Sequence, residues 1–278
     1  MIAAEAAEPL IVTSADGVPV ACWRTGTGPP LVLVHGTGED HRRWRLVAAR
    51  LGRRFAVYAV DRRGRGASGD AAPYSLAAEA ADIAAVVDHL ARATGGAVSV
   101  LAHSYGAICA VEAARLATGL AGLVLYEPPI PVPGSADFSG LAARLRRLVA
   151  DGQADRAVTD FLVLAAGLPP EQVFALRTGN GHRTAERAAL ASTLAREIEA
   201  TQGYVLRPGA FAALAAPVLL LVGQRSPATM RAAVDMLAAA LPRSRVTVLE
   251  GQSHCAMDTA PRAFLDTVLG FFEEAMAA

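Results

Sequence analysis

Two kinds of apolar segment alternate along the chain. Short runs rich in Val, Leu and Ile indicate strands, and from residue 31 onward these runs lack polar alternation, as expected of parallel strands that are covered on both faces. Longer segments rich in Ala, Leu and Arg have apolar residues at helical spacing. The pattern predicts strands at 9–13, 18–24, 31–34, 55–60, 98–102, 122–126, 218–222 and 246–249. It predicts helices near 41–51, 75–92, 104–117, 227–241 and 261–276.

The alternation of strands and helices predicts the fold class. Strand, helix and strand in succession favour right-handed crossovers, so we expect an α/β protein with a doubly wound, mostly parallel sheet of eight strands. The first two strands are joined by SADG at 14–17, which is a hairpin signal. That edge of the sheet should therefore be antiparallel.

A long segment, residues 131–210, contains no predicted strand. It contains four helical patterns, of which the first places Leu141, Leu145 and Leu148 on one face. The others lie at 158–165, 170–178 and 184–202. The segment is too long for a crossover and too periodic for a disordered loop. We therefore predict a core domain formed by residues 1–130 and 211–278, with a helical cap at 131–210 inserted after the sixth strand.

Composition and charge exclude several classes of function. The chain has 278 residues, 53% hydrophobic, with a formal net charge of zero, so nothing favours a nucleic acid or a membrane as partner. Arg62, Arg63 and Arg65 could suggest a phosphate patch, but the charge balance gives it no support. Every basic residue is arginine, which excludes a lysine nucleophile.

The cysteines and the N-terminal residues indicate the compartment. Cys22, Cys109 and Cys255 lie far apart without metal-ligand spacing, which favours buried thiols over a disulfide framework or a zinc site. Residues 1–10, MIAAEAAEPL, lack the basic start of a secretory signal, and no apolar run reaches 18 residues. We expect a cytoplasmic protein without a metal.

The segment VSVLAHSYGAICAVEAA (98–114) carries the strongest chemical signal. A buried strand ends at Ala102 and a helical pattern begins almost at once, with Ser104 between them. The small residues Ala102 and Gly106 permit a turn so sharp that the serine hydroxyl stands clear of the sheet. Ser104 is therefore a candidate nucleophile, and the alternative is that it only caps the helix.

Two further motifs accompany the serine. A buried strand runs into His35-Gly36-Thr37-Gly38, where glycines let the backbone approach a ligand and the N–H of Thr37 could face an oxyanion. His254 lies on a loop after the last strand, where a histidine can act as a base. GRGASG at 64–69 matches a dinucleotide-binding pattern, but no helix opens directly after it. Each motif alone has a structural explanation, and their combination indicates a catalytic site.

Taken in order, these motifs make the chain resemble the α/β-hydrolase family over essentially its whole length. The resemblance rests on HGTG (35–38), DRRGRGASG (61–69), AHSYG (102–106), the helical insertion and EGQSH (250–254). It implies Ser104 as nucleophile and His254 as general base. The N–H groups of Thr37 and Tyr105 would form the oxyanion hole, and no cofactor would be needed.

The acid that orients the histidine is the point on which this chain departs from the family. The family usually carries a carboxylate after the seventh strand, where this chain has Gln224, Arg225 and Ser226. We predict that Glu127, at the end of the sixth strand and before two prolines, supplies the acid. Ser226 is predicted to cap the following helix, with Pro227 at its first position. The alternatives are that Glu127 only bonds the cap hinge, that Asp258 is the acid, or that Ser104 and His254 act as a dyad.

The resemblance leads to three functional hypotheses. The first is hydrolysis of an ester, thioester or lactone of a mostly hydrophobic small molecule through an acyl-Ser104 intermediate, with His103 and Trp44 lining the substrate pocket. The second keeps the site but not the hydrolysis, as in lyases, acyl-eliminating enzymes or cyclases that tailor natural products. The third is an inactive binding module.

Overall fold

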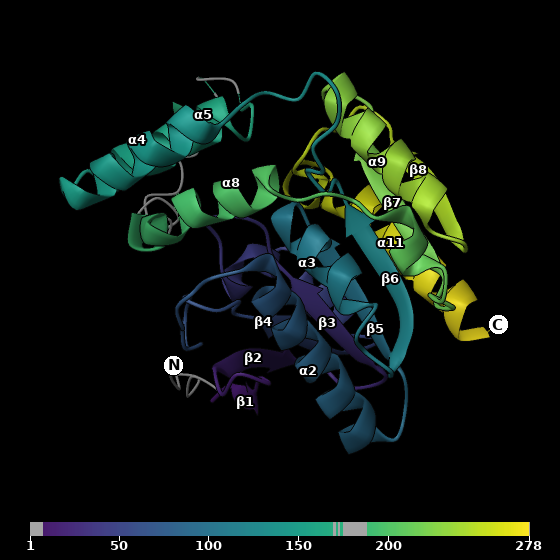
Figure 1. The fold of residues 1–278 in the computed structure, drawn as a ribbon. Coiled ribbons are helices and arrows are strands. Elements are labelled where there is room, and N and C mark those ends of the chain that lie inside the picture. Colours follow the sequence, from purple (N-terminus) through teal and green to yellow (C-terminus); the bar gives the residue numbers. More distant parts are fainter. Residues whose placement is uncertain (1–7, 169–170, 172, 175–187, 278) are drawn as a thin grey trace, which may run out of the picture.

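The computed structural model describes residues 8–168, 171, 173–174 and 188–277, and a sheet of eight strands forms its centre (Figure 1). The strand order is β1-β2-β4-β3-β5-β6-β7-β8. β1 and β2 are antiparallel, as are β2 and β4, and the other pairs are parallel. The strands are β1 (Leu10–Thr13), β2 (Pro19–Thr25), β3 (Pro30–Val34), β4 (Ala56–Val60), β5 (Val98–His103), β6 (Leu120–Tyr126), β7 (Val218–Gly223) and β8 (Ser244–Leu249). All eight predicted strands and the antiparallel edge are confirmed.

Helices cover both faces of the sheet, which explains the unbroken apolar runs of its central strands. One face packs against α2 (Leu76–Thr94), α3 (Tyr105–Ala113) and α9 (Ala228–Ala240). The other packs against α1 (Ala48–Leu51), α10 (Ala256–Thr259) and α11 (Pro261–Ala277). Each face therefore has its own hydrophobic cluster, and the parallel strands are buried between them.

The structure corrects the helix predicted near 41–51. The chain forms a 3-10 turn, η1 (His41–Trp44), followed by the short helix α1. Its hydrogen bonds join residues three apart, as from Arg43 N–H to Asp40 O and from Val47 N–H to Trp44 O. Arg43 and Trp44 are both buried in this turn, and Arg43 forms an ion pair with Asp258 at 2.8 Å.

Between β6 and β7 the regular elements of the described residues are all helical. They include α4 (Ser139–Ala150), α5 (Ala154–Leu164), η2 (Ala191–Thr193), α8 (Leu194–Gln202) and η3 (Pro208–Phe211). The pattern predicted at 170–178 lies mostly outside the described residues. α4, α5 and α8 share a third hydrophobic cluster, and Figure 1 shows them beyond the end of the sheet at which α3 begins.

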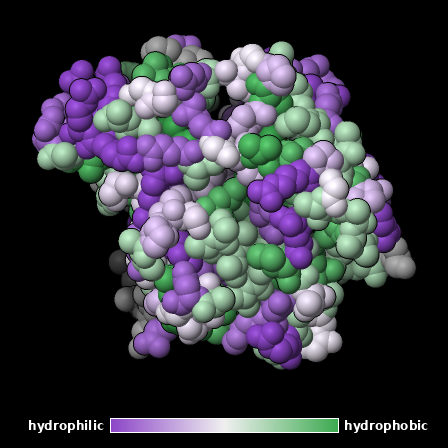
Figure 2. Space-filling model, in the orientation of Figure 1, coloured by the Kyte–Doolittle hydropathy of each residue, from purple (hydrophilic) through white to green (hydrophobic). Residues whose placement is uncertain are grey.

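Part of the surface of this helical segment is polar. Figure 2 shows hydrophilic residues gathered over α4, in contrast to the more apolar face below it. In the described part of the chain, no helix is both long enough and apolar enough to cross a membrane.

Candidate active site

Ser104 occupies the sharp turn between β5 and α3. Its φ of 55° and ψ of −129° lie outside the usual regions for a non-glycine residue, and its N–H donates to Tyr126 O at 2.9 Å. At the start of α3 it makes no side-chain capping bond, so the hydroxyl is not used as a helix cap. A Cβ on Gly106 would lie 2.2 Å from His35 O, so only glycine lets α3 begin this close to β3.

The turn after β3 lies directly against this serine. A Cβ on Gly36 would lie 3.0 Å from Ser104 Cβ, so the backbone of the turn is in contact with the Ser104 side chain. No described residue accepts a hydrogen bond from the N–H of Thr37 or of Tyr105. Tyr105 is also the first residue of α3, where the helix dipole favours negative charge. The two predicted donors are thus free to bind an oxyanion.

The structure brings His254 and Glu127 together. His254 Nδ1 is 2.6 Å from Glu127 Oε2, and Glu127 is fully buried. The second carboxylate oxygen, Oε1, accepts the N–H of Gly223 at 2.7 Å and the hydroxyl of Ser226 at 2.5 Å. The carboxylate therefore has three hydrogen-bond contacts, which hold it against the imidazole.

The prediction that Ser226 caps the next helix is wrong. α9 begins at Ala228 with Pro227 as its N-cap residue, and no side chain caps it. The Ser226 hydroxyl instead donates to Glu127, because a buried carboxylate needs hydrogen-bond donors more than an exposed helix end does. The alternative acid, Asp258, forms an ion pair with Arg43 at 2.8 Å.

The backbone of Glu127 is also unusual. Its φ of 48° is in the left-handed region, which is uncommon for a residue with a side chain. The N–H of Glu127 donates to Leu221 O at 3.0 Å, so β6 still pairs with β7 at this point. The turn directs the side chain toward His254, and the three contacts of the carboxylate compensate for the strain.

Two aromatic residues hold the loop that carries His254. Tyr126 donates its hydroxyl to Ser253 O and accepts the N–H of Ala256 at 3.2 Å. His103 Nε2 is 2.8 Å from His254 O, and the two imidazole centroids are 4.5 Å apart. Tyr126 was not predicted, although its position between a buried strand and Glu127 is the signal that could have indicated it.

The two side chains predicted to line a substrate pocket are buried instead. Trp44 is fully buried in the hydrophobic cluster on the α11 face of the sheet, where it contributes to core packing. Burial, and next the nearby His254, hold the pKa of His103 well below its ordinary value. A neutral His103 therefore donates its Nε2 proton to the His254 carbonyl and supports the loop.

We expect the buried histidines to make the protein less stable in acid. Burial lowers the pKa of both His35 and His103 well below 6.5, so below that pH the unfolded chain binds protons that the folded protein does not. The free energy of unfolding should therefore fall as pH decreases below 6.5, by up to about 1.4 kcal/mol per pH unit for each histidine. Urea unfolding between pH 7.5 and 5 would measure this, and His103→Gln should reduce the slope. Equal slopes for the two proteins would contradict the assignment.

One group of described residues, Asp40, His41 and Asp61, has potential ligand atoms within 4.8 Å of one another. Asp61 already accepts hydrogen bonds from the N–H and Nδ1 of His41, from Trp23 and from the Ala67 N–H. Although burial opposes it, these bonds lower the pKa of Asp61 to about 2. The carboxylate is thus a hydrogen-bond centre that holds the turn after β4 against β2, with little capacity left for a cation.

The fold and the site define the class of protein. A family model described as the alpha/beta hydrolase family matches residues 31–267, and the chain belongs to this family. A solved alpha/beta hydrolase from Sphaerobacter thermophilus is 34% identical with a TM-score of 0.80, and the match covers 95% of this chain and 100% of that one. An esterase from a Rhodococcus species is 26% identical with a TM-score of 0.75, over 96% of this chain and 99% of that one.

Relatives named for amide chemistry are also similar. N-formylmaleamate deformylase from Pseudomonas putida is 43% identical over 113 residues, which are 39% of this chain and 41% of that protein. This match thus spans less than half of the deformylase. The 2-(acetamidomethylene)succinate hydrolase from Mesorhizobium japonicum is 27% identical over 257 residues, covering 89% of each chain. The chain is therefore an enzyme of a superfamily whose relatives include several kinds of hydrolase.

Proposed function

We propose that the protein is a serine hydrolase that cleaves an ester, thioester or lactone through an acyl-Ser104 intermediate. The observation that carries this proposal is the 2.6 Å contact between His254 Nδ1 and the buried Glu127 carboxylate. By accepting the Nδ1 proton, Glu127 leaves the Nε2 lone pair free to take a proton from a hydroxyl. A site without an acid would favour the second hypothesis, a non-hydrolytic enzyme, and Glu127 can supply this acid.

The proposed reaction has two stages. His254 takes the proton of Ser104 as the serine oxygen attacks the substrate carbonyl, and the N–H groups of Thr37 and Tyr105 bind the resulting oxyanion. The imidazolium then gives its proton to the leaving group as the carbon–oxygen or carbon–sulfur bond breaks. In the second stage His254 takes a proton from water, which attacks the acyl group, and the proton returns to Ser104.

We also propose that residues 131–210 act as a cap over this site. A Cβ on Gly38 would lie 2.8 Å from Leu194 Cδ2, so α8 contacts the oxyanion turn itself. The apolar faces of α4, α5 and α8 pack mainly against one another. We propose separately that the site prefers an apolar acyl group. The dependence of hydrolysis on acyl length measures this preference.

Labelling with a fluorophosphonate and turnover of p-nitrophenyl esters test the proposal together. We expect labelling at Ser104 and hydrolysis that improves with acyl length from acetyl to butyryl. Each methylene that is buried should raise kcat/KM by about fourfold, from about 0.8 kcal/mol per CH₂. Labelling without turnover of any ester would favour the non-hydrolytic hypothesis. Matched p-nitroanilides test for amide hydrolysis, because turnover of the anilides as well as the esters would indicate an amide hydrolase. This comparison is included because the relatives include a deformylase and a 2-(acetamidomethylene)succinate hydrolase.

A further inference from the structure

Arg62, in the turn after β4, contacts the oxyanion turn without reaching the reacting atoms. It is fully buried, and its Nη2 donates to Gly36 O at 3.0 Å. His35 Nδ1 is 2.8 Å from the same oxygen. The Arg62 N–H donates to His35 Nε2 at 3.2 Å, so the proton of this neutral imidazole is on Nδ1 and also points at Gly36 O. The Gly36 carbonyl thus accepts two hydrogen bonds, one from the Arg62 side chain and one from His35, whose tautomer is set by the backbone N–H of Arg62.

These bonds determine where the N–H of Thr37 points. The Gly36 carbonyl and the Thr37 N–H belong to one planar, trans peptide, in which the two bonds point in opposite directions. Fixing the carbonyl against Arg62 therefore holds the Thr37 N–H on the side of the peptide that faces away from Arg62. The turn that carries this N–H also contacts the Ser104 side chain. A cation at the carbonyl oxygen also polarises the peptide and makes its N–H a stronger donor.

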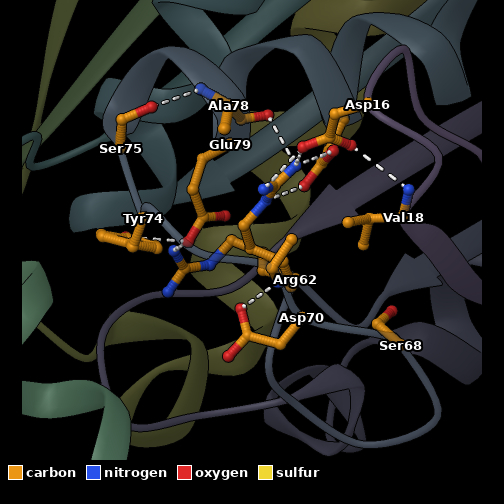
Figure 3. Close-up of polar contacts among 12 residues, drawn as sticks. Asp16, Val18, Arg62, Ser68, Asp70, Tyr74, Ser75, Ala78 and Glu79 are labelled. Atoms are coloured by element: carbon orange, nitrogen blue, oxygen red, sulfur yellow. Dashed lines mark hydrogen bonds and ion pairs between the residues drawn. The ribbon is translucent and has the colours of Figure 1, made fainter.

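Arg62 also contacts the side chain of Tyr105, whose backbone N–H is the second proposed donor. Its guanidinium carbon is 5.0 Å from the centre of the Tyr105 ring. The Tyr105 hydroxyl is 2.9 Å from the hydroxyl of Tyr74, which in turn donates to Glu79 Oε1 at 2.9 Å. Glu79 Oε1 also accepts from Arg62 Nη1 at 2.9 Å, and Figure 3 shows Tyr74 and Glu79 next to each other, joined by a dashed line. One buried cluster therefore supports both donors of the oxyanion hole.

The last member of this cluster comes from the helical segment. Glu197 of α8 is fully buried, with Oε2 at 2.9 Å from Arg62 Nη2 and a second ion pair to Arg65. Arg62, Arg65, Glu79 and Glu197 together are electrically neutral, which is the condition under which buried charges are tolerated. If α8 moved away, Arg62 would lose one of its two carboxylates and the cluster would carry a net positive charge.

We propose that Arg62 is a positioning residue for the oxyanion hole, and that Glu197 makes its orientation depend on the docking of α8. The catalytic geometry is then complete only when this part of the helical segment is in place. This inference rests on the proposed acyl transfer at Ser104. It adds that the docking of α8 controls the geometry of the oxyanion hole.

The test compares the rate of Ser104 labelling by a fluorophosphonate in three variants. Glu197→Gln keeps the shape of the side chain and removes its charge. The pair Arg62→Gln with Glu197→Gln removes both partners and leaves Arg65 opposite Glu79, so the cluster stays neutral and the variant can fold. Asp70→Asn is the matched control, because it breaks another ion pair of α8, from Arg196 to Asp70 at 2.7 Å, which does not involve Arg62.

We expect labelling to slow about tenfold in Glu197→Gln and up to about 100-fold in the pair, the lower end of the effect of losing one oxyanion donor. The effect stays at this lower end because His35 still bonds Gly36 O when the Arg62 side chain is replaced. Asp70→Asn should stay within about twofold of the wild type, since Arg62 keeps its partners. Turnover should show a lower kcat with little change in KM. The preference for a p-nitrophenyl ester over its thionoester should shrink by the same factors, because the larger sulfur gains little from the donors.

Two outcomes would overturn the inference. The first is that folded Glu197→Gln and the folded pair label Ser104 at the wild-type rate and keep the ester-to-thionoester ratio. The second is that Asp70→Asn slows labelling as much as Glu197→Gln, because the effect would then come from loosened docking alone. Failure of the proposed function is a different result, in which the wild type itself is not labelled at Ser104.

Discussion

Replacing Ser104 by alanine should lower kcat/KM by roughly three to six orders of magnitude, because the nucleophile and its base act as a unit. The structure gives a reason to expect that the fold survives. The Ser104 side chain makes no capping bond to α3, and its backbone bond to Tyr126 O does not involve the hydroxyl. Circular dichroism and thermal unfolding of the variant should therefore match the wild type.

The Ser104→Ala experiment needs a control for general effects of losing a hydroxyl. Ser139 is exposed at the start of α4, far along the chain from the turn that carries Ser104. Ser139→Ala should therefore keep full activity. Both variants are measured on the ester that the wild type cleaves best, and fluorophosphonate labelling should disappear only in Ser104→Ala. Near-wild-type turnover by Ser104→Ala would exclude a covalent mechanism at this serine.

Replacing Glu127 by glutamine should lower kcat by up to about 10⁴-fold, the effect of carboxylate-to-amide changes in serine proteases. Both oxygens of Glu127 accept hydrogen bonds, Oε2 facing His254 Nδ1 and Oε1 facing the Gly223 N–H and the Ser226 hydroxyl. An amide has only one oxygen. Its NH₂ group must therefore face either the imidazole or the Gly223 N–H, and in the first case it favours the wrong tautomer of His254.

Kinetics of Glu127→Gln across pH measure this effect, and a loss of less than tenfold would contradict Glu127 as the acid.

A second variant tests whether the turn after β7 can still carry the acid, as it usually does in the family. The Ser226 hydroxyl lies 2.5 Å from Glu127 Oε1, so Ser226→Asp places a new carboxylate at this contact. Added to Glu127→Gln, it should recover at least about tenfold of the lost kcat, since it restores an anion near His254. No recovery would show that the β7 turn does not aim an acid at the imidazole.

Much of the fold and of the candidate site could be predicted because its signals are local. A buried strand that ends in a small residue before Ser104, or in a glycine-rich turn after Val34, shows in a few consecutive residues. The same holds for Glu127, which precedes two prolines at the end of β6. The order of parallel strands then places these ends at one edge of the sheet, so the sequence was enough to bring His254, Glu127 and the oxyanion turn to the same side as Ser104.

Other features depend on partners that are distant in the chain and were not predictable. Ser226 lies 99 residues from Glu127, and its hydroxyl serves as a donor to that carboxylate because the packing of β6 beside β7 buries the charge. Arg62 and Glu197 are 135 residues apart, and the sequence around Arg62 suggested at most a phosphate patch, without support from the charge balance. The sequence also did not show that Trp44 is buried in the core, or that the buried His103 bonds the His254 carbonyl and supports its loop. Local sequence thus determined which backbone elements form and where the reactive groups stand. Only the tertiary structure determined which polar side chains are taken out of water, and hence which partners they must find.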